Sequence, residues 1–321
     1  MKHGSVGAGG LGGPAYEVLD LRMGDLVEPD AQLRRLWTGA QWSEGPVYVP
    51  ALRSLLWSDI PNDRVLRFDE RTGEVTVDRG PSAFANGHTL DLQGRVLTCE
   101  HGNRRVIRCE TDGSQTVIAD RYDGGRLNSP NDVVVKSDGS VWFTDPPYGI
   151  LSDREGHAAV SEQSGNHVYR CDPATGELRI ATTAIEEPNG LAFSVDESVL
   201  YVSDTSAALR KDGTGNHQIV AFDVIDGREL GEPRVFAVME PGLADGFRID
   251  VNDNLFSSSA DGVHVIASDG VTVGRIPAPE VVSNCEFGGP EGTTLYVTAS
   301  TSLYAIELST AGATAARGRA R

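Results

Sequence analysis

Six side chains that carry oxygen donors recur along the chain at intervals of 39 to 58 residues. Each stands at the start of a short apolar run, and together they are Glu44, Asn86, Asn131, Asn189, Asp245 and Asn284. Asn and Asp before glycine are ordinary turn residues, and this interpretation explains any one of them well. It explains poorly six oxygen donors with no Lys, Arg or apolar residue among them. A fold that brings the six together would create a cage for a divalent cation.

The ligand types in this cage indicate which metal it suits. Two carboxylates and several amide oxygens favour a hard cation, with calcium first and magnesium or manganese next. Zinc or ferrous iron could occupy the same cage. A cysteine zinc cluster is not indicated, because no pair has CxxC spacing among Cys99, Cys109, Cys171 and Cys285. We therefore expect one divalent metal ion and four reduced, mostly buried thiols.

The elements that must position these residues are short β-strands. Runs such as "RVLTCEH", "SVWFTDP" and "VLYVSDT" are five to seven residues long, rich in β-branched and aromatic residues, and bounded by Gly, Asp, Asn or Pro. Asp-Gly pairs, typical of hairpin turns, recur between them. No convincing amphipathic helix exceeds two turns, so the sequence predicts an all-β chain.

The strands fall into six similar units, each beginning at one of the six polar residues. Every unit has the same order: polar residue, apolar strand, turn, second strand ending near Ser, Thr or Asp, third strand, turn and fourth strand. Units of about 40 residues with four strands are typical of β-propeller blades. The third and fourth units carry insertions at about 149–166 and 205–216. The sixth lacks a strand, which the segment 33–40 could supply.

The sequence therefore predicts a single six-bladed β-propeller over residues 21–310, with its ring closed by an N-terminal strand that joins the last blade. The innermost strand of each blade lines the central channel, and its first residues lie at one mouth. The six polar residues should converge there. Residues 1–20 are expected to form a flexible glycine-rich lead, and residues 311–321 a disordered basic tail.

Composition limits the partners. A net charge of −18 makes nucleic acid and anionic membranes poor partners. No apolar run approaches the 18 residues of a membrane span, and the N-terminus lacks a signal-peptide core. We expect a cytoplasmic protein, monomeric or homodimeric, that acts on small molecules.

Four motifs in order, "WSEGPVY", "SPNDV", "EPNGLAFS" and "ADGFRID", resemble the gluconolactonase/senescence marker protein (regucalcin) family of six-bladed propellers. The resemblance covers about residues 30 to 310. The stretches "NGHTLDLQGRVLTCEHGNRRVIR" and "SVWFTDPPYG" resemble the bacterial gluconolactonase branch of that family. The family hydrolyses sugar lactones and related esters with a divalent metal, and more distant relatives hydrolyse organophosphates.

The resemblance also implies roles for single residues. Glu44, Asn189 and Asp245 match the metal ligands of the family, and Asn131 matches a position that binds metal or substrate. One departure concerns the third blade, where mammalian members carry an Arg two positions before this Asn and the present chain has Ser129. Polyol recognition through that Arg is therefore not expected here.

A metal in this cage would polarise a lactone carbonyl and lower the pKa of a water that it binds. Asp245 is our first candidate for the base that takes the proton of this water, since it is an acid at the channel mouth and matches the proposed base of the family. Asp145, in "TDPPYG", is the second candidate, although a turn acid before two prolines is an equally good interpretation.

Substrate contacts are expected mainly from the second and third units. The candidates are Asn86, His88, Glu100, His101, Asn131 and Tyr148. Alternation along the two strands of the second unit predicts that at least one of His88, Glu100 and His101 faces the channel mouth. Arg104 and Arg105 are expected to pair with acids within the blade. No GxSxG elbow, P-loop or GxGxxG fingerprint offers another chemistry.

Three functional hypotheses follow from these residues. The first is a metal-dependent lactonase that opens a lactone, with a sugar lactone such as an aldonolactone foremost. The second is an esterase or organophosphate hydrolase that uses the same cage. The third is a propeller that binds a metal or ligand without turnover, since a fold does not decide a function. Convergent oxygen donors favour an enzyme, because a scaffold does not need them.

Overall fold

The computed structural model describes residues 16–172, 174–210 and 212–313. This part of the chain is almost entirely β-structure. Its helices are single short turns: η1 (Leu21–Asp25), η2 (Pro50–Leu52), η3 (Ile60–Asn62), α1 (Tyr148–Leu151) and η4 (Ser206–Ala208). None of these described helices has the length and apolar character needed to cross a membrane.

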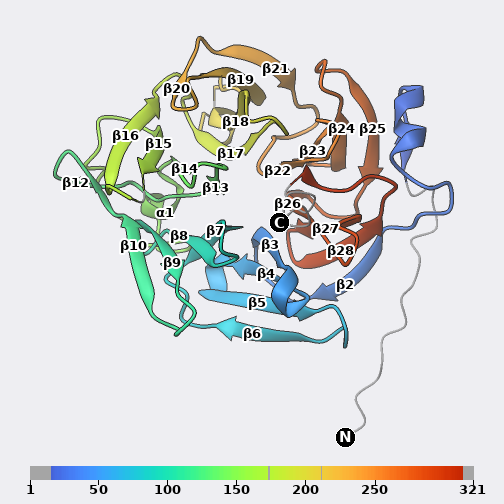
Figure 1. The fold of residues 1–321 in the computed structure, drawn as a ribbon, viewed down its shortest axis with the longest axis horizontal. Helices are drawn as coiled ribbons and strands as arrows, with labels where there is room; N and C mark the ends of the chain where they lie inside the picture. Colours follow the sequence, from blue (N-terminus) through green and yellow to red (C-terminus); the bar gives the residue numbers. More distant parts are fainter. Residues whose placement is uncertain (1–15, 173, 211, 314–321) are drawn as a thin grey trace, which may run out of the picture.

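Six antiparallel sheets stand around a central axis, and Figure 1 views the ring along that axis. Blade 1 consists of β3 (Ser43–Val49), β4 (Ser54–Asp59), β5 (Arg64–Asp69) and β6 (Val75–Arg79). Blade 2 consists of β7 (Ala85–Leu90), β8 (Val96–Glu100), β9 (Arg105–Cys109) and β10 (Gln115–Ala119). A small hairpin, β11 (Arg121–Tyr122) and β12 (Gly125–Arg126), follows. Blade 3 consists of β13 (Val133–Val135), β14 (Val141–Asp145), β15 (His167–Asp172) and β16 (Glu177–Thr182).

The remaining blades repeat this outward order. Blade 4 consists of β17 (Pro188–Phe193), β18 (Val199–Asp204), β19 (Gln218–Ile225) and β21 (Arg234–Val238), with the short β20 (Glu229–Leu230) also paired to β19. Blade 5 consists of β22 (Phe247–Ile249), β23 (Leu255–Ser259), β24 (Gly262–Ile266) and β25 (Thr272–Pro277). Blade 6 consists of β26 (Val282–Gly288), β27 (Thr294–Ala299) and β28 (Ser302–Glu307).

The outermost strand of blade 6 comes from the other end of the chain. Strand β2 (Arg34–Thr38) pairs with β28, in a register that places Arg34 opposite Ala305. The two strands lie side by side in Figure 1, blue against red. This confirms the predicted closure of a six-bladed propeller by an N-terminal strand, which pairs with the outer edge of β28.

Ordered structure extends slightly beyond the predicted boundaries at both ends. Strand β1 (Glu17–Val18) pairs with β25 at the rim of blade 5, and Gly312 forms a bridge with Asp250. Residues 1–15 of the predicted lead and 314–321 of the predicted tail lie outside the described residues.

The hydrophobic core is divided among the spaces between blades. Six clusters are present in the described residues, one at each interface between neighbouring blades. Trp57 of blade 1 belongs to the same cluster as Tyr296 of blade 6, and the rings of Tyr48 and Tyr296 stack at 6.0 Å. Because each blade is packed on both faces, the inner strands have little freedom to shift. The residues at their starts are therefore held in fixed positions.

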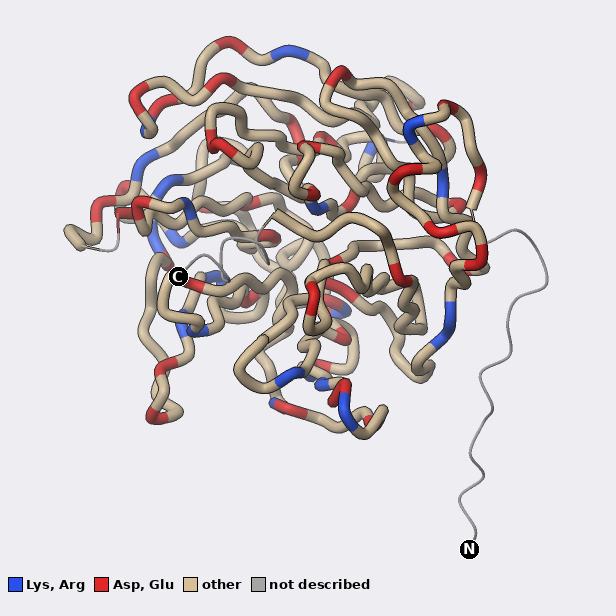
Figure 2. The backbone as a smooth tube through the Cα atoms, turned by 45° about the vertical axis from the view of Figure 1, so that its right-hand side comes forward, with Lys and Arg blue, Asp and Glu red and all other residues tan. Residues whose placement is uncertain are grey.

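The acidic residues and the cysteines test two further expectations from the sequence. Figure 2 shows acidic residues spread over the loops and strands around the whole ring, and the sequence has 46 Asp and Glu against 28 Lys and Arg. The expectation that polyanions are poor partners rests on this excess and stays a prediction. All four cysteines are free thiols, and Cys99, Cys171 and Cys285 are buried, as predicted.

Candidate active site and metal centre

A cavity of about 460 Å³ lies at the end of the channel where the inner strands begin. Five of the six repeated polar residues line it: Glu44, Asn86, Asn131, Asn189 and Asp245. The sixth, Asn284, lies behind Glu44, and its Nδ2 donates a hydrogen bond to Glu44 Oε2 at 3.2 Å. The predicted convergence of residues up to 240 positions apart is therefore present in the structure.

Local backbone structure explains why these residues point into the mouth. Glu44, Asn86 and Asn189 lie inside strands β3, β7 and β17, not in turns. In each strand the register with the next strand shifts soon after the polar residue. Such a bulge redirects a side chain from the sheet face toward the strand end. The turn interpretation of these three residues is therefore wrong.

The glycines that follow the site residues join neighbouring blades. Gly87 N donates to Asn131 O at 2.8 Å, and Gly190 N donates to Asp245 O at 2.9 Å. A Cβ atom at Gly45, which has φ +55°, would overlap the carbonyl oxygen of Asn86. The glycine is required here because the backbone of the next blade comes so close. These contacts fix the separation between consecutive site residues around the mouth.

Glu44 is the deepest acid of the cavity, with only 4% of its surface exposed. Its Oε2 accepts from Gly45 N at 2.5 Å and from Asn284. Its Oε1 is buried without a hydrogen-bond partner among the described residues. Burial, and next the charge of Asp245, raise the pKa of Glu44 well above its ordinary value. The protein thus holds a carboxylate oxygen that only a further group, such as a cation, would satisfy.

Asp245 stands beside Glu44 at the start of β22. Its backbone N donates a hydrogen bond to Ser258 Oγ at 2.8 Å, which ties the residue to β23. Burial raises the pKa of Asp245 to about 7, and the neighbouring side chains of Glu44 and Asn189 oppose this effect. The pKa values of both adjacent carboxyl groups are raised, which means that their ionised forms are destabilised in this site.

The amide side chains around the acids are oriented by partners. His101 Nδ1 lies 2.9 Å from the carbonyl oxygen of Glu155, so this nitrogen carries the proton. Burial lowers the pKa of His101 to about 4, which keeps the ring neutral, and Nε2 accepts from Asn86 Nδ2 at 3.2 Å. Asn86 therefore turns its Oδ1 away from His101. Asn189 Nδ2 similarly lies 3.5 Å from Thr205 Oγ1.

These groups fit a divalent cation with oxygen ligands. Two destabilised carboxyl groups and one unpartnered buried oxygen are the features that a hard cation would compensate. No three His, Cys, Asp or Glu side chains in the described ranges form a group able to hold a metal. The cage must therefore be completed by amide oxygens, and Asn131 and Asn189 line the same cavity.

Two predicted substrate-binding residues, His88 and Glu100, do not line the cavity. His88 is buried between Ser58 Oγ and Thr98 Oγ1, each at 2.9 Å. Glu100 accepts from Arg105 Nε at 2.6 Å and from Asn103 Nδ2 at 2.8 Å. Their side chains are engaged within blades 1 and 2, so the expectation that they contact substrate is not supported by their positions.

Asp145, the second candidate base, also lies outside the cavity lining. It is fully buried at the end of β14, and its Oδ2 accepts from Asn128 N at 2.7 Å. Burial raises its pKa to about 7. A raised pKa alone does not make a base, because the carboxyl group must also reach the reacting water. Asp245 satisfies that geometric condition better.

The remaining predictions for blades 2 and 3 have clear outcomes. His101 and Tyr148 line the cavity, and Tyr148 OH lies 2.6 Å from Thr205 Oγ1. Arg105 pairs with Glu100 of the same blade at 2.6 Å, as expected, whereas Arg104 pairs at 3.2 Å with Glu162, which lies in the insertion of the third unit and not within blade 2. Ser129 is buried, donates to Pro146 O at 2.6 Å and accepts from Gly149 N at 2.9 Å. It anchors the segment that carries Tyr148.

Several cavity residues were missed by the sequence analysis. They include Trp42, Arg154, Glu155, Thr205 and Leu243. Arg154 and Glu155 belong to the insertion of the third unit, which has no counterpart in the other units. The repeat pattern therefore carried no signal for them, whereas Trp42 stands two residues before Glu44 and could have been proposed.

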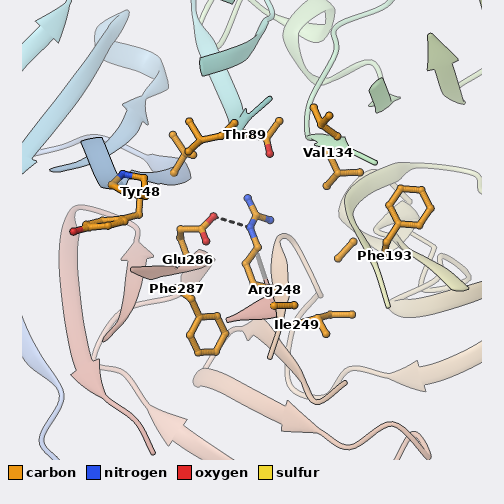
Figure 3. A pocket seen from close by; sticks show the side chains of 14 residues that line it. Tyr48, Thr89, Val134, Phe193, Arg248, Ile249, Glu286 and Phe287 are labelled. Carbon is orange, nitrogen blue, oxygen red and sulfur yellow. Dashed lines mark hydrogen bonds and ion pairs between the residues drawn. The ribbon is translucent and has the colours of Figure 1, made fainter. Parts of the chain in front are cut away.

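A second cavity, of about 130 Å³, lies at the opposite end of the inner strands. Figure 3 shows Arg248 and Glu286 meeting inside it, with Arg248 Nε 2.9 Å from Glu286 Oε2, and apolar side chains such as Phe193 and Phe287 around them. Asp132 Oδ2 lies 3.7 Å from Arg248. Since the charges here are already paired, we assign the chemistry to the larger cavity.

Comparison with known proteins agrees with this geometry. Residues 42–301 match the family model described as the SMP-30/gluconolactonase/LRE-like region. The chain is 31% identical over 313 residues to a gluconolactonase of Zymomonas mobilis, covering 91% of this chain and 85% of that protein. It is 30% identical over 271 residues to a pentonolactonase of Haloferax volcanii, covering 81% and 82%.

Solved structures give the same assignment. A gluconolactonase from Xanthomonas campestris superimposes with a TM-score of 0.87 at 39% sequence identity, covering 95% of this chain and 98% of that one. The matched region contains every residue of the oxygen cage, and both ends of the match enclose all six inner strands. The chain belongs to the SMP-30/gluconolactonase/LRE-like family.

Proposed function

We propose that this protein is a lactonase that depends on a divalent metal and opens a sugar lactone. The observation that carries the proposal is the pairing of Glu44, with its unpartnered buried oxygen, and Asp245 in a large cavity at the channel mouth. The activities named for the relatives, gluconolactonase and pentonolactonase, support lactone hydrolysis as the reaction.

Glu44, Asn131, Asn189 and Asp245 would hold the metal. When bound, a divalent cation would supply Lewis-acid polarisation of the lactone carbonyl and a more acidic water. Calcium is our first choice, because the donors are two carboxylates and amide oxygens, with magnesium, manganese, zinc or ferrous iron as alternatives.

Asp245 is the residue that moves the proton. Its ionised carboxylate accepts a proton from the attacking water as the water oxygen bonds to the carbonyl carbon. The bond between that carbon and the ring oxygen then breaks, and the ring oxygen takes the proton back from Asp245. The product is the open-chain hydroxy acid, and Asp245 returns to its ionised form.

The other cavity residues position the substrate. His101 is neutral and fixes the Asn86 amide, while the hydroxyl groups of Tyr148 and Thr205 are within hydrogen-bond distance of each other on the blade 3 and blade 4 side. Trp42 lines the cavity on the side of blade 1. A lactone placed between these walls would present its carbonyl to Glu44 and Asp245.

The test is a hydrolysis assay with a pH indicator, using sugar and aliphatic lactones, aryl esters and phosphotriesters. The protein is first treated with a chelator, and each divalent metal is then added back. We expect lactone turnover that disappears after chelation and returns with metal. Turnover of esters or phosphotriesters alone would favour the second hypothesis, and no turnover with any metal would favour a binding propeller.

A further inference from the structure

Glu155 lies over the cavity in a segment that is held firmly to the propeller. The segment leaves β14 through α1, and His157 N donates to Gly149 O at 2.9 Å. Ala159 N donates to Ile150 O at 3.0 Å, and a Cβ atom at Gly156 would overlap Gly149 O. The carbonyl oxygen of Glu155 accepts from His101 Nδ1. Three hydrogen bonds of backbone atoms, together with the close approach of Gly156 to Gly149, thus fix Glu155 without using its carboxyl group.

Glu155 is one of the residues that line the cavity, and its carboxyl group is not engaged by any residue that the structure describes. The side chain is half-buried and lines the cavity, and it has neither a hydrogen bond nor an ion pair with any residue that the structure describes. Burial raises its pKa, and the nearby Arg154 partly opposes this effect. Its charge also raises the pKa of Asp245, so the two carboxyl groups are close enough to interact.

Glu155 does not belong to the metal cage. If Glu155 reached the same position as Glu44 and Asp245, the three acids would form a group of potential metal ligands. The described residues contain no such group. Glu155 therefore lies within electrostatic range of the cage but outside ligand range. A carboxylate in that position can contact only what occupies the cavity beside the metal.

The cavity around Glu155 has two different walls. Blades 2, 3 and 4 contribute hydrogen-bonding side chains, namely Asn86, His101, Tyr148, Arg154, Glu155 and Thr205. Blades 1, 5 and 6 contribute the acids Glu44 and Asp245, the hydroxyl group of Ser259 and otherwise mainly apolar side chains, namely Trp42, Ile60, Leu243, Ala260, Val281 and Val282. A ring with hydroxyl groups on one side and C–H bonds on the other matches this division, because an ionised carboxylate only accepts hydrogen bonds and a hydroxyl group donates them.

We propose that Glu155 determines substrate specificity by accepting hydrogen bonds from the ring hydroxyl groups of a polyhydroxylated lactone. This proposal rests on the proposed lactonase function and adds the residue that distinguishes a sugar lactone from an unsubstituted one. It assigns to the third-blade insertion the polyol recognition that Ser129 cannot provide. A hydrogen bond to a charged group accounts for about a ten- to hundredfold preference.

The experiment compares two six-membered lactones that differ in their hydroxyl groups, D-glucono-1,5-lactone and δ-valerolactone. We expect Glu155→Ala to lower the ratio of their kcat/KM values by about ten- to a hundredfold, and Glu155→Gln, which keeps a carbonyl acceptor, to lower it less. Glu177→Gln removes one acid from the outer strand of the same blade and should leave the ratio unchanged. Equal loss on both lactones would overturn the proposal.

A binding measurement separates this proposal from the lactonase function. 1,5-Anhydro-D-glucitol carries the ring hydroxyl groups without a carbonyl, and calorimetry gives its affinity without turnover. We expect Glu155→Ala to weaken that affinity by about tenfold or more. If the wild-type protein hydrolyses neither lactone, the proposed function fails, while the loss of polyol affinity still supports Glu155. Unchanged polyol affinity overturns the role of Glu155 even in an active lactonase.

Discussion

Because Glu44 Oε1 has no hydrogen-bond partner in the described part of the chain, a substitution at Glu44 should change both the stability of the metal-free protein and its affinity for metal. In Glu44→Gln the side chain keeps its size, loses its charge and gains an amide that can donate to Asp245. A buried polar atom without a partner costs about 1–3 kcal/mol, so the metal-free variant should be more stable than the metal-free wild type by about that amount. At roughly 2–4 °C per kcal/mol, the melting temperature should rise by about 2–12 °C.

The same substitution should weaken metal binding. Loss of a partner that merely orients a metal ligand costs about 10- to 100-fold in affinity, so loss of one of two carboxylate ligands should cost at least as much. Metal at about 100 times its dissociation constant stabilises a protein by about 2.7 kcal/mol. Calorimetric melts of chelated protein, titrated with calcium, should show this stabilisation in the wild type and little of it in Glu44→Gln.

Glu100 provides the matched control, since it is equally buried but fully paired. Its carboxylate accepts from Arg105 and Asn103, and removal of one partner of a buried ion pair costs about 3–5 kcal/mol. Glu100→Gln should therefore lower the melting temperature and keep the calcium response. If metal-free Glu44→Gln melted below the wild type, or kept the full calcium response, Glu44 would not be an unpartnered metal ligand.

Two further predictions concern Asp245. Asp245→Asn keeps an oxygen ligand but removes the base, so at saturating metal it should lose about 100-fold or more in kcat; near-normal turnover would make Asp245 a ligand only. Burial raises the pKa of Asp245 from 3.8 to about 7 in the metal-free protein, so the folded state holds this proton more tightly than the unfolded chain. Stability from this group is complete below about pH 4 and is lost as the pH rises through about 7, by at most about 4 kcal/mol. Melts from pH 4 to 8 should show this loss without metal and not with it, and parallel curves would contradict the assignment.

The sequence was sufficient to predict the cage because the cage repeats with the blades. One oxygen donor opens each unit, and closing the ring brings the openings together whatever the loops do. The strand that closes the ring was predictable for a similar reason, because the sixth unit lacked a partner that the segment 33–40 could supply. Both inferences depend on counting units and not on the exact ends of strands.

Side-chain direction within a unit was not predictable to the same degree. Alternation placed His88 and Glu100 as candidates for the channel mouth, but the register between β7 and β8 shifts between Ala85 and His88. A bulge of this kind changes which face the following residues occupy. His88 therefore turns between blades, whereas His101, just beyond β8, reaches the cavity. A bulge leaves no clear mark in a single sequence.

Glu44 and Asp245 are positioned by different parts of the chain from Glu155. Glu44 and Asp245 are fixed by inner strands whose backbones touch from blade to blade, so they cannot move without disturbing neighbouring blades. Glu155 is held by a surface insertion, which tolerates change more readily. The proposed metal binding is therefore constrained by the ring itself, while the proposed substrate choice can change through the insertion. A fold organised in this way can keep one hydrolytic centre and acquire different lactones as substrates.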